Sequence, residues 1–458
     1  VLRAISDVGA RAKPAGGDPL QTLLAARPRD EAALKREYRE KGLDKEPDTF
    51  VLYRIIGNDL YPRHKKGQSR ENIRFILENE PELDGCQKRW VVNRIIDPEE
   101  ERQIIAMLEA YGQPFLHIPF VAEEYRRIGW DFDALPAPGY LAGEEFRKLE
   151  PLQEDRLRAA LYRLKNNYVM HNNGARNAAL RDGRSRAKWV LPWDGNGFVT
   201  AKAWQEIRHA VTARPHLKYF AVPMERVTDN SILLRDDFTP NPVEEPQLLF
   251  RRDASEEFND GFPYGRRPKV ELFWHLGIPG PWDRWKDDPW ERKRRGLSPE
   301  AHQFGVAGWV ARMNSGAGEL EQKDQVSFKN RGRVRQEAII AAIDHVDDII
   351  HSPSQDPDGL AFYTVDALDR LATAVREGRG DTLPLAKKIL EDAERSLGEA
   401  PYSVIQKTTL PPSGDSHDYW HPAPYWWPDP RKKNGQPYVR KDGQRVPGTR
   451  MYEPESAQ

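Results

Sequence analysis

Apolar and polar positions follow two different periods along residues 50–120, and the change of period marks the elements. Three apolar, β-branched runs predict buried strands at Phe50–Ile56, Arg89–Ile96 and Pro114–Phe120. Between them, apolar residues recur every three or four positions in Ser69–Asn79 and in the segment that follows Asp97, which predicts two helices. Strands that alternate with helices at this spacing favour an α/β fold with a mostly parallel sheet.

The stretch Tyr168–Asn196 continues this pattern and ends in polar residues. A helical segment stops at the turn signal Asp182-Gly183, and the apolar run Ala187–Leu191 then predicts another buried strand. The strand delivers Asp194-Gly195-Asn196 to its C-terminal end, where open α/β sheets bind ligands. A carboxylate and an amide oxygen at this place are suited to hold a divalent cation beside a diphosphate.

Two motifs in this stretch resemble the middle of a GT-A glycosyltransferase, a Rossmann-like nucleotide-sugar domain. They are N-G-A-R-N-A-A-L and W-V-L-P-W-D-G-N, which contain Arg176 and Asp194. The resemblance implies a Mn²⁺ or Mg²⁺ ion bound to a nucleotide-sugar donor, with a saccharide as acceptor. It departs from the family at Asn196, where a second Asp is usual, and an uncharged ligand lowers the expected metal affinity. A helix, turn and strand of an unrelated α/β fold is the alternative.

The resemblance also assigns roles to individual residues. The expected metal ligands are Asp194, Asn196 and a late histidine, His275, and the expected donor contacts are Asn58, Asp59, Arg176 and Asn177. For an inverting transfer a carboxylate must accept the proton of the acceptor hydroxyl, and the spacing does not choose among the candidates Asp253, Glu256, Glu257 and Glu271.

A tryptophan-rich segment follows at residues 271–290. Indole rings stack on sugar rings, so this segment suits a saccharide acceptor, although the same side chains also serve as core anchors. The candidate glycan contacts here are Trp274, Trp282 and Trp285.

The chain after residue 316 has a helical pattern. Val334–Ile350 predicts a helix with an apolar side, and Asp344 and Asp348 favour a solvated acidic face over a metal site. Tyr363–Arg376 and Leu383–Leu397 predict two further helices.

The segments Lys407–Tyr419 (KTTLPPSGDSHDY) and Ala423–Pro430 (APYWWPDP) resemble the opening of the alginate lyase family. The resemblance implies the start of an α/α toroid and the cleavage of uronate polysaccharides by β-elimination. The family's catalytic Asn, His, Arg and Tyr lie downstream of this opening, so we expect a truncated module. Its aromatic residues Tyr425, Trp426 and Trp427 are expected to line one wall of a glycan cleft.

These patterns divide the 458 residues into a leader with a surface helix (1–48), a GT-A-like domain (49–315), a linker and helix (316–354) and a lyase-like helical part (355–458). The net charge of −1 argues against general nucleic-acid binding, and no apolar run reaches the ~18 residues of a membrane span. The single cysteine, Cys86, leaves the compartment open. A nucleotide-sugar enzyme favours the cytoplasm, and secretion stays possible because the chain begins at Val1 without an initiator Met.

Three functions are compatible with the sequence. The first is sugar transfer from a nucleotide-diphosphate donor to a saccharide. The second is a polysaccharide lyase whose first module only binds glycan. The third is a glycan-binding protein without catalysis, in which Asn196 marks a lost metal site.

Overall fold

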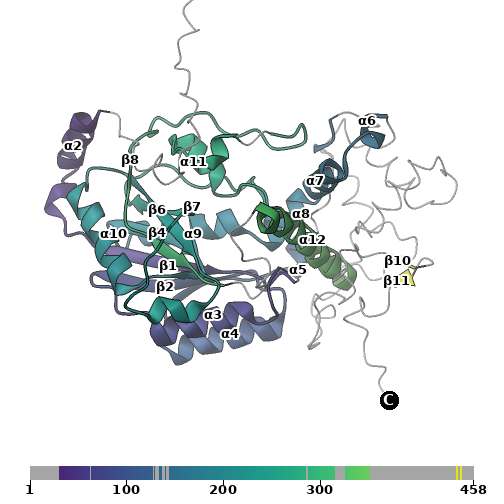
Figure 1. Ribbon diagram of the computed structural model, residues 1–458, viewed down its shortest axis with the longest axis horizontal. Helices are drawn as coiled ribbons and strands as arrows, with labels where there is room; N and C mark the ends of the chain where they lie inside the picture. Colours follow the sequence, from purple (N-terminus) through teal and green to yellow (C-terminus); the bar gives the residue numbers. More distant parts are fainter. Residues whose placement is uncertain are drawn as a thin grey trace, which may run out of the picture.

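The computed structural model describes residues 30–350, apart from short gaps at 62, 127–143 (in part), 285–286 and 315–324, together with 440–441 and 444–445. Its centre is a mixed sheet covered by helices, which confirms the predicted α/β class (Figure 1). The strands are β1 (Phe50–Ile56), β2 (Cys86–Asn93), β3 (Phe115–Ile118), β4 (Trp189–Asp194), β5 (Gly197–Phe198), β6 (Tyr219–Arg226), β7 (Glu244–Arg251), β8 (Phe304–Val306) and β9 (Val310–Arg312).

The strand order is β3-β2-β1-β4-β7-β6-β9-β5, and β8 also pairs with β6. β1 runs parallel to β2 and to β4, whereas β7 is antiparallel to both of its neighbours, β4 and β6. In this register Ile55 lies opposite Asp194, and Trp189 lies opposite Arg251. β7 therefore starts at the edge that carries Asp194 and ends at the other edge.

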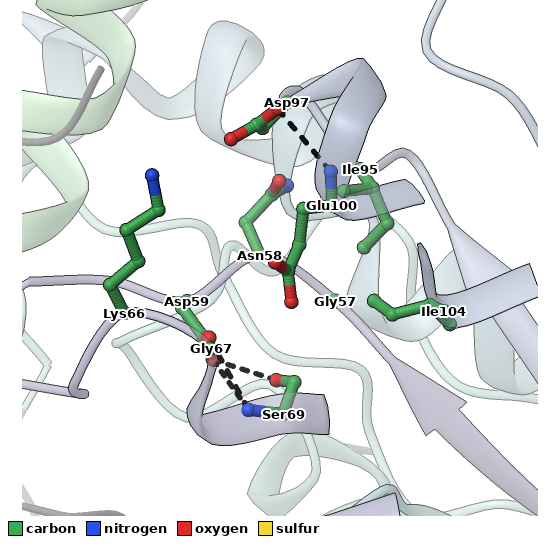
Figure 2. A pocket seen from close by; sticks show the side chains of 10 residues that line it. All are labelled: Gly57, Asn58, Asp59, Lys66, Gly67, Ser69, Ile95, Asp97, Glu100 and Ile104. Atoms are coloured by element: carbon green, nitrogen blue, oxygen red, sulfur yellow. Dashed lines mark hydrogen bonds between the residues drawn. The ribbon is translucent and has the colours of Figure 1, made fainter. Parts of the chain in front are cut away.

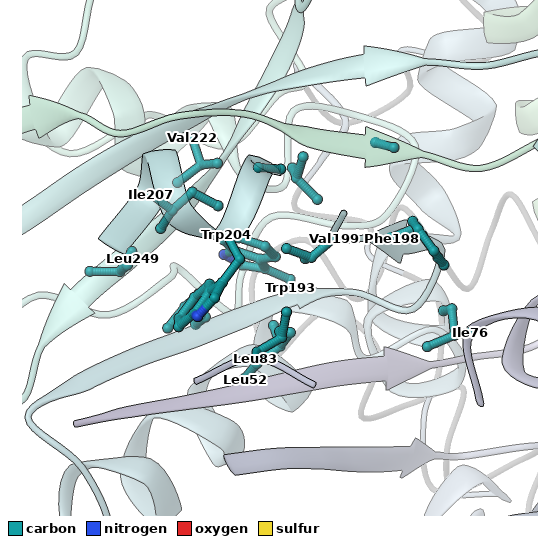
Figure 3. Packing of buried hydrophobic residues seen from close by; sticks show 14 of the residues in the cluster. Leu52, Ile76, Leu83, Trp193, Phe198, Val199, Trp204, Ile207, Val222 and Leu249 are labelled. Atoms are coloured by element: carbon teal, nitrogen blue, oxygen red, sulfur yellow. The ribbon is translucent and has the colours of Figure 1, made fainter. Parts of the chain in front are cut away.

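Successive residues of each strand point to opposite faces, and this divides the core into two layers. Leu52, Trp193 and Val222 pack on one face with the helices α3 (Gln68–Asn79), α4 (Pro98–Ala110) and α10 (Ala201–Ala213) (Figure 3). The odd-numbered positions of β1 pack on the other face, with α9 (Asn172–Arg184) and α11 (Val270–Leu276). Because both faces are covered, the central strands read as continuous apolar runs.

Side-chain caps start two helices, one of them at the predicted boundary after Asp97. The Asp97 carboxylate accepts a hydrogen bond from the amide N of Glu99 (2.9 Å), and Pro98 opens α4. The hydroxyl of Thr200 accepts one from the amide N of Ala203 (3.1 Å) at the start of α10. Each cap satisfies a helix N–H group that has no partner within the helix.

Two local predictions are wrong. β2 ends at Asn93 rather than at Ile96, because Arg94 adopts a left-handed conformation (φ 45°) that leaves the strand. The helix before the sheet, α2 (Glu31–Glu40), is more than a surface helix, since its Leu34 and Tyr38 are buried.

A third core lies beside the sheet, where α12 (Gln325–Ile350) packs on α7 (Pro151–Leu161) and α8 (Arg163–Val169) (Figure 1). Asp344 does not lie on the expected solvated face, because it is fully buried, as is Asp347; the side chain of Asp348 lies outside the described residues. Tyr162 donates a hydrogen bond to Asp344 (2.9 Å), while Tyr125 and Lys165 donate to Asp347 (2.7 and 2.6 Å). The carboxyl group of Asp347 is compensated by the ammonium group of Lys165, so the helix buries this polar side as well as its apolar side.

The remaining short helices are α5 (Ala122–Arg126), α6 (Glu144–Arg147), and the 3₁₀ turns η1 (Leu43–Lys45), η4 (Asn230–Leu234) and η5 (Pro281–Arg284). Near the C-terminus β10 (Arg440–Lys441) pairs with β11 (Gln444–Arg445). The helices predicted at Tyr363–Arg376 and Leu383–Leu397, the toroid, and the aromatic residues Trp285, Tyr425, Trp426 and Trp427 lie outside the described residues.

Candidate functional site

The candidate site lies at the sheet edge formed by the C-terminal ends of β1 and β4. The neighbour of β1 along the chain, β2, lies on one side of it, while β4 lies on the other, so this edge is a topological switch point. Gly195 brings the loop after β4 directly onto the end of β1: a Cβ atom at this position would lie 2.5 Å from the carbonyl oxygen of Ile55. Glycine is required here by this close approach, and it fixes Asp194 at the switch point.

Three side chains hold the Asp194 carboxylate. Arg176, in the first turns of α9, donates to one oxygen at 2.6 Å. Gln247 of β7 and Lys269, which precedes α11, donate to the other at 2.9 and 3.3 Å. Burial would raise the pKa of Asp194, but the charges of Lys269 and Arg176 outweigh it and hold that pKa well below its usual value. Asp194 is therefore an anion that is already paired within the protein.

More cations than carboxylates lie around Asp194 and its partners Arg176 and Lys269. Lys269 also lies 3.2 Å from Glu245, and Arg226, at the end of β6, forms a two-pronged ion pair with Glu244 (3.0 and 2.9 Å). Arg312, at the end of β9, approaches Glu244 only to 3.9 Å.

The guanidinium of Arg312 is the least compensated charge of the group. Its buried Nε has no hydrogen-bond partner among the described residues, and the same holds for the Nε of Arg176. Burial and the neighbouring Arg226 lower the pKa of Arg312. Arg176, Arg226, Lys269 and Arg312 thus face the three carboxylates Asp194, Glu244 and Glu245, and the charge of Arg335 also acts on Arg312, so cations outnumber carboxylates at this edge.

A small pocket lies at the same edge, after β1 (Figure 2). The predicted donor contacts Asn58 and Asp59 line it, together with Lys66 and Glu100. The Asn58 amide donates to the carbonyl of Arg94 and accepts from the amide N of Ile96 (both 2.8 Å), so it joins the loops after β1 and β2.

Asp59 accepts hydrogen bonds from the hydroxyl and the amide N of Ser69, at 2.7 and 3.1 Å (Figure 2). Burial nevertheless raises the pKa of Asp59 to about 7, with a smaller contribution from the nearby charge of Glu100. The carboxyl is thus protonated on the acid side of neutrality, where it can donate a hydrogen bond as well as accept one.

The other two predicted donor contacts, Arg176 and Asn177, bind different parts of the structure. Arg176 reaches the switch point through Asp194, as described above. Asn177 instead holds the loop after β7, because its amide donates to the Phe258 carbonyl and to Asp260, and its oxygen accepts from the Phe258 amide N.

The structure does not bring the predicted catalytic carboxylates to Asp194. Asp253 follows the end of β7 at the opposite edge, where it binds Arg251 and Lys41. Glu257 binds Arg181 and Arg184 at the far end of α9. Glu271 is fully buried and forms a two-pronged pair with Arg295 (2.9 and 2.8 Å).

The three predicted metal ligands, Asp194, Asn196 and His275, do not lie together. Asn196 stays beside Asp194, and its amide lies 3.5 Å from the Met313 carbonyl. His275 is engaged elsewhere: its ring nitrogens contact the Gly296 carbonyl (2.5 Å) and Glu256 (2.8 Å). Within the part of the chain that the structure describes, no three His, Cys, Asp or Glu side chains form a metal-binding group.

These residues do not suit a divalent cation. Unit charges about 4 Å apart interact by roughly 4 kcal/mol at an effective dielectric constant of about 20, and a divalent ion doubles this. An ion on Asp194 would meet that repulsion from both Arg176 and Lys269, which is of the same order as the attraction of one carboxylate.

The predicted glycan contacts Trp274 and Trp282 are core anchors. Each is only 4% exposed, and the Trp282 ring packs 4.9 Å from Phe273 and donates to the Ile278 carbonyl. Trp274 lies under Arg294, whose guanidinium is 4.2 Å from its ring centre. Neither indole face is open to a sugar ring.

The sequence interpretation missed Gln247, Lys269, Arg226 and Arg312. The missing information was strand direction, because an antiparallel β7 brings its first residues, not its last, to the switch point. Arg226 and Arg312 each end a strand, but nothing in the local sequence marks them as neighbours of Asp194.

Comparison with known proteins adds one match. Residues 403–457 match the alginate lyase family. This confirms the resemblance carried by Lys407–Tyr419 and Ala423–Pro430, and the match covers only this C-terminal stretch. None of the curated proteins that were compared matches the sequence. No helix among the described residues is both long and apolar enough to cross a membrane.

Proposed function

We propose that the domain built on β1–β9 binds the diphosphate of a nucleotide sugar at the switch point and transfers the sugar to a saccharide. The observation that carries this proposal is the excess of positive charge at the ends of β4, β6 and β9, where Arg176 and Lys269 pair with Asp194 and Arg312 lies near Asp194 and Glu244. Phosphate groups are the common anionic ligands of this edge in α/β proteins, and guanidinium groups bind them with charge-assisted hydrogen bonds.

The pocket after β1 lies at the same edge as Asp194, because Ile55 of β1 lies opposite Asp194 of β4. Its lining combines polar side chains (Asn58, Asp59) with an apolar wall (Ile95, Ile104), and its cavity of about 20 Å³ would have to open further to take a nucleoside (Figure 2). The resemblance of the Asp194-Gly195-Asn196 segment to GT-A enzymes agrees with this arrangement.

The reaction breaks the bond between the anomeric carbon and the diphosphate oxygen, and the electron pair leaves with the diphosphate. The acceptor hydroxyl forms the new bond to that carbon and loses its proton to a base. Glu245, whose side chain is 31% exposed at this edge, is placed better for that role than Asp253 or Glu257. The cations would stabilise the negative charge on the leaving diphosphate.

A turnover assay with uridine, guanosine and thymidine diphosphate sugars tests the proposal. The expected result is slow release of the nucleoside diphosphate by the wild type and loss of this release in Arg176→Ala. Arg181→Ala is the matched control, because it lies on the same helix but is exposed at the opposite end. Equal release by both variants, or none by the folded wild type, would contradict the proposal.

The match at residues 403–457 favours a second candidate, a polysaccharide lyase. A β-elimination removes the proton beside the uronate carboxyl and expels the glycosidic oxygen, which leaves a carbon–carbon double bond at the new end. Incubation with alginate and related uronans, followed by ultraviolet absorption of the unsaturated product, tests this candidate. An unchanged spectrum with the complete natural polypeptide would remove it.

A further inference from the structure

The contacts of Asp194 raise a question about how the charge of a diphosphate is neutralised. In the resembled enzymes a strand-end acidic motif holds a metal ion for this purpose. In this chain the corresponding carboxylate is occupied by Arg176 at 2.6 Å and by Lys269 at 3.3 Å, and Gln247 donates to it as well. The position that a metal would take is therefore filled by side-chain cations.

The second position of the motif points the same way. Asn196 brings no charge, and its backbone carbonyl accepts a hydrogen bond from the amide N of Met313 (2.9 Å). This contact joins the motif to the end of β9, so Arg312 lies opposite Gly197 in the sheet. The motif thus carries an arginine beside it rather than a second carboxylate.

We propose that the diphosphate is bound by the side chains of Arg176, Lys269 and Arg312 without a divalent metal, and that Asp194 positions two of these cations. The proposal rests on the proposed function and gives its diphosphate site a specific chemistry. The buried Nε atoms of Arg176 and Arg312, which lack partners among the described residues, are the donors that phosphate oxygens would satisfy. Other charged groups near this cluster are Glu244, Glu245, Arg226 and Arg335.

The role of Asp194 distinguishes this arrangement from a metal site. If Asp194 ligated a metal, its replacement by Asn would abolish diphosphate binding. If Asp194 only positions Arg176 and Lys269, the same change removes a competing anion and leaves both cations to the phosphate oxygens.

Calorimetric titration with inorganic pyrophosphate, uridine diphosphate and guanosine diphosphate tests the proposal, in EDTA and in Mn²⁺. We expect at least one of the three to bind equally well in both conditions. Asp194→Asn should bind it at least as tightly as the wild type, and Arg312→Gln should bind it about tenfold more weakly or worse, as expected for a lost charge-assisted hydrogen bond. Arg252→Gln is the control, because it pairs with Glu46 at the opposite edge.

Binding that requires Mn²⁺ and disappears in Asp194→Asn would overturn the metal-free site while leaving the proposed transferase intact. Absence of binding in both conditions, together with absence of donor turnover by the folded protein, would overturn the proposed function itself. Circular dichroism and thermal melting of each variant establish that the fold is retained.

Discussion

The charged side chains at the two edges of the central sheet are paired differently. At the edge where β7 ends, Asp253 pairs with Arg251 and Lys41, and Glu257 pairs with two arginines of α9. At the edge where β4 ends, Arg312 has only a distant carboxylate, 3.9 Å away. Each of the four cations at the first edge lies within 2.8 Å of a carboxylate, whereas Arg312 at the second edge does not, and a cation without a close carboxylate is what an anion site requires.

A carboxylate that is paired as tightly as Asp253 is unsuited to act as a catalytic base. Burial would raise the pKa of Asp253, but its hydrogen bond and ion pair with Arg251 lower the pKa to about 2. A carboxylate held in this way is a weak base at neutral pH, because proton transfer is most efficient near the operating pH. Pairing of this kind stabilises the folded protein instead.

The largest expected effect is a loss of stability on substitution of Trp282, which lies at neither edge. Trp282→Ala should lower the free energy of unfolding by about 3–5 kcal/mol, because it empties a packed site against Phe273. Chemical denaturation measures this change. Unaltered stability with reduced saccharide binding would show that the tryptophan serves the glycan rather than the core.

Substitution of Arg251 at one edge and of Arg312 at the other tests directly whether the two edges differ. Arg251→Gln should lower the free energy of unfolding by about 3 kcal/mol, since the change leaves a buried part of an ion pair uncompensated. Lys41 remains beside Asp253 and limits the loss. Diphosphate binding by the folded fraction should not change.

Arg312→Gln should weaken diphosphate binding but leave the stability of the fold nearly unchanged. Its stability should stay within about 1 kcal/mol of the wild type, because only a long ion pair is lost. If Arg312→Gln destabilised the fold as much as Arg251→Gln does, the two edges would not differ in the way proposed here.

A further expected effect depends on pH. The folded-state pKa of Asp59 is about 7, above the usual value of an aspartate, so this group favours folding at low pH. Its contribution is fully present below pH ~4 and is lost as the pH rises towards 7, by at most about 1.4 kcal/mol per pH unit. Asp59→Asn should therefore be more stable than the wild type at pH 8 but not at pH 4. Parallel pH–stability curves would contradict this assignment.

Much of the fold could be predicted from the pattern of apolar residues. Phe50–Ile56 was predicted at its observed bounds, and Asp97-Pro98 marked the start of α4, because both signals are local. The direction of β7 could not be predicted, since an apolar run reads the same for parallel and antiparallel strands. Asp253, one of the candidate bases, follows the last residue of β7 and therefore lies at the opposite edge, whereas Gln247 of β7 donates a hydrogen bond to Asp194.

The site was predicted less completely than the fold, for a related reason. Asp194 and Arg176 belong to one continuous helix-turn-strand, so the sequence places them together. Lys269 and Arg312 reach Asp194 and its neighbours from segments 75 or more residues away, and nothing local marks them as partners. The burial of Trp274 and of Asp347 likewise depends on which helices pack against them.

Hydrogen–deuterium exchange with a nucleoside diphosphate tests the central claim most directly, because it reports where the ligand lies. We expect slower exchange of backbone amides at residues 57–59, 172–176, 194–197 and 311–314, which border the switch point. We expect no change at residues 251–257, at the opposite edge. Protection at the opposite edge, or none at the switch point under saturating ligand, would contradict it.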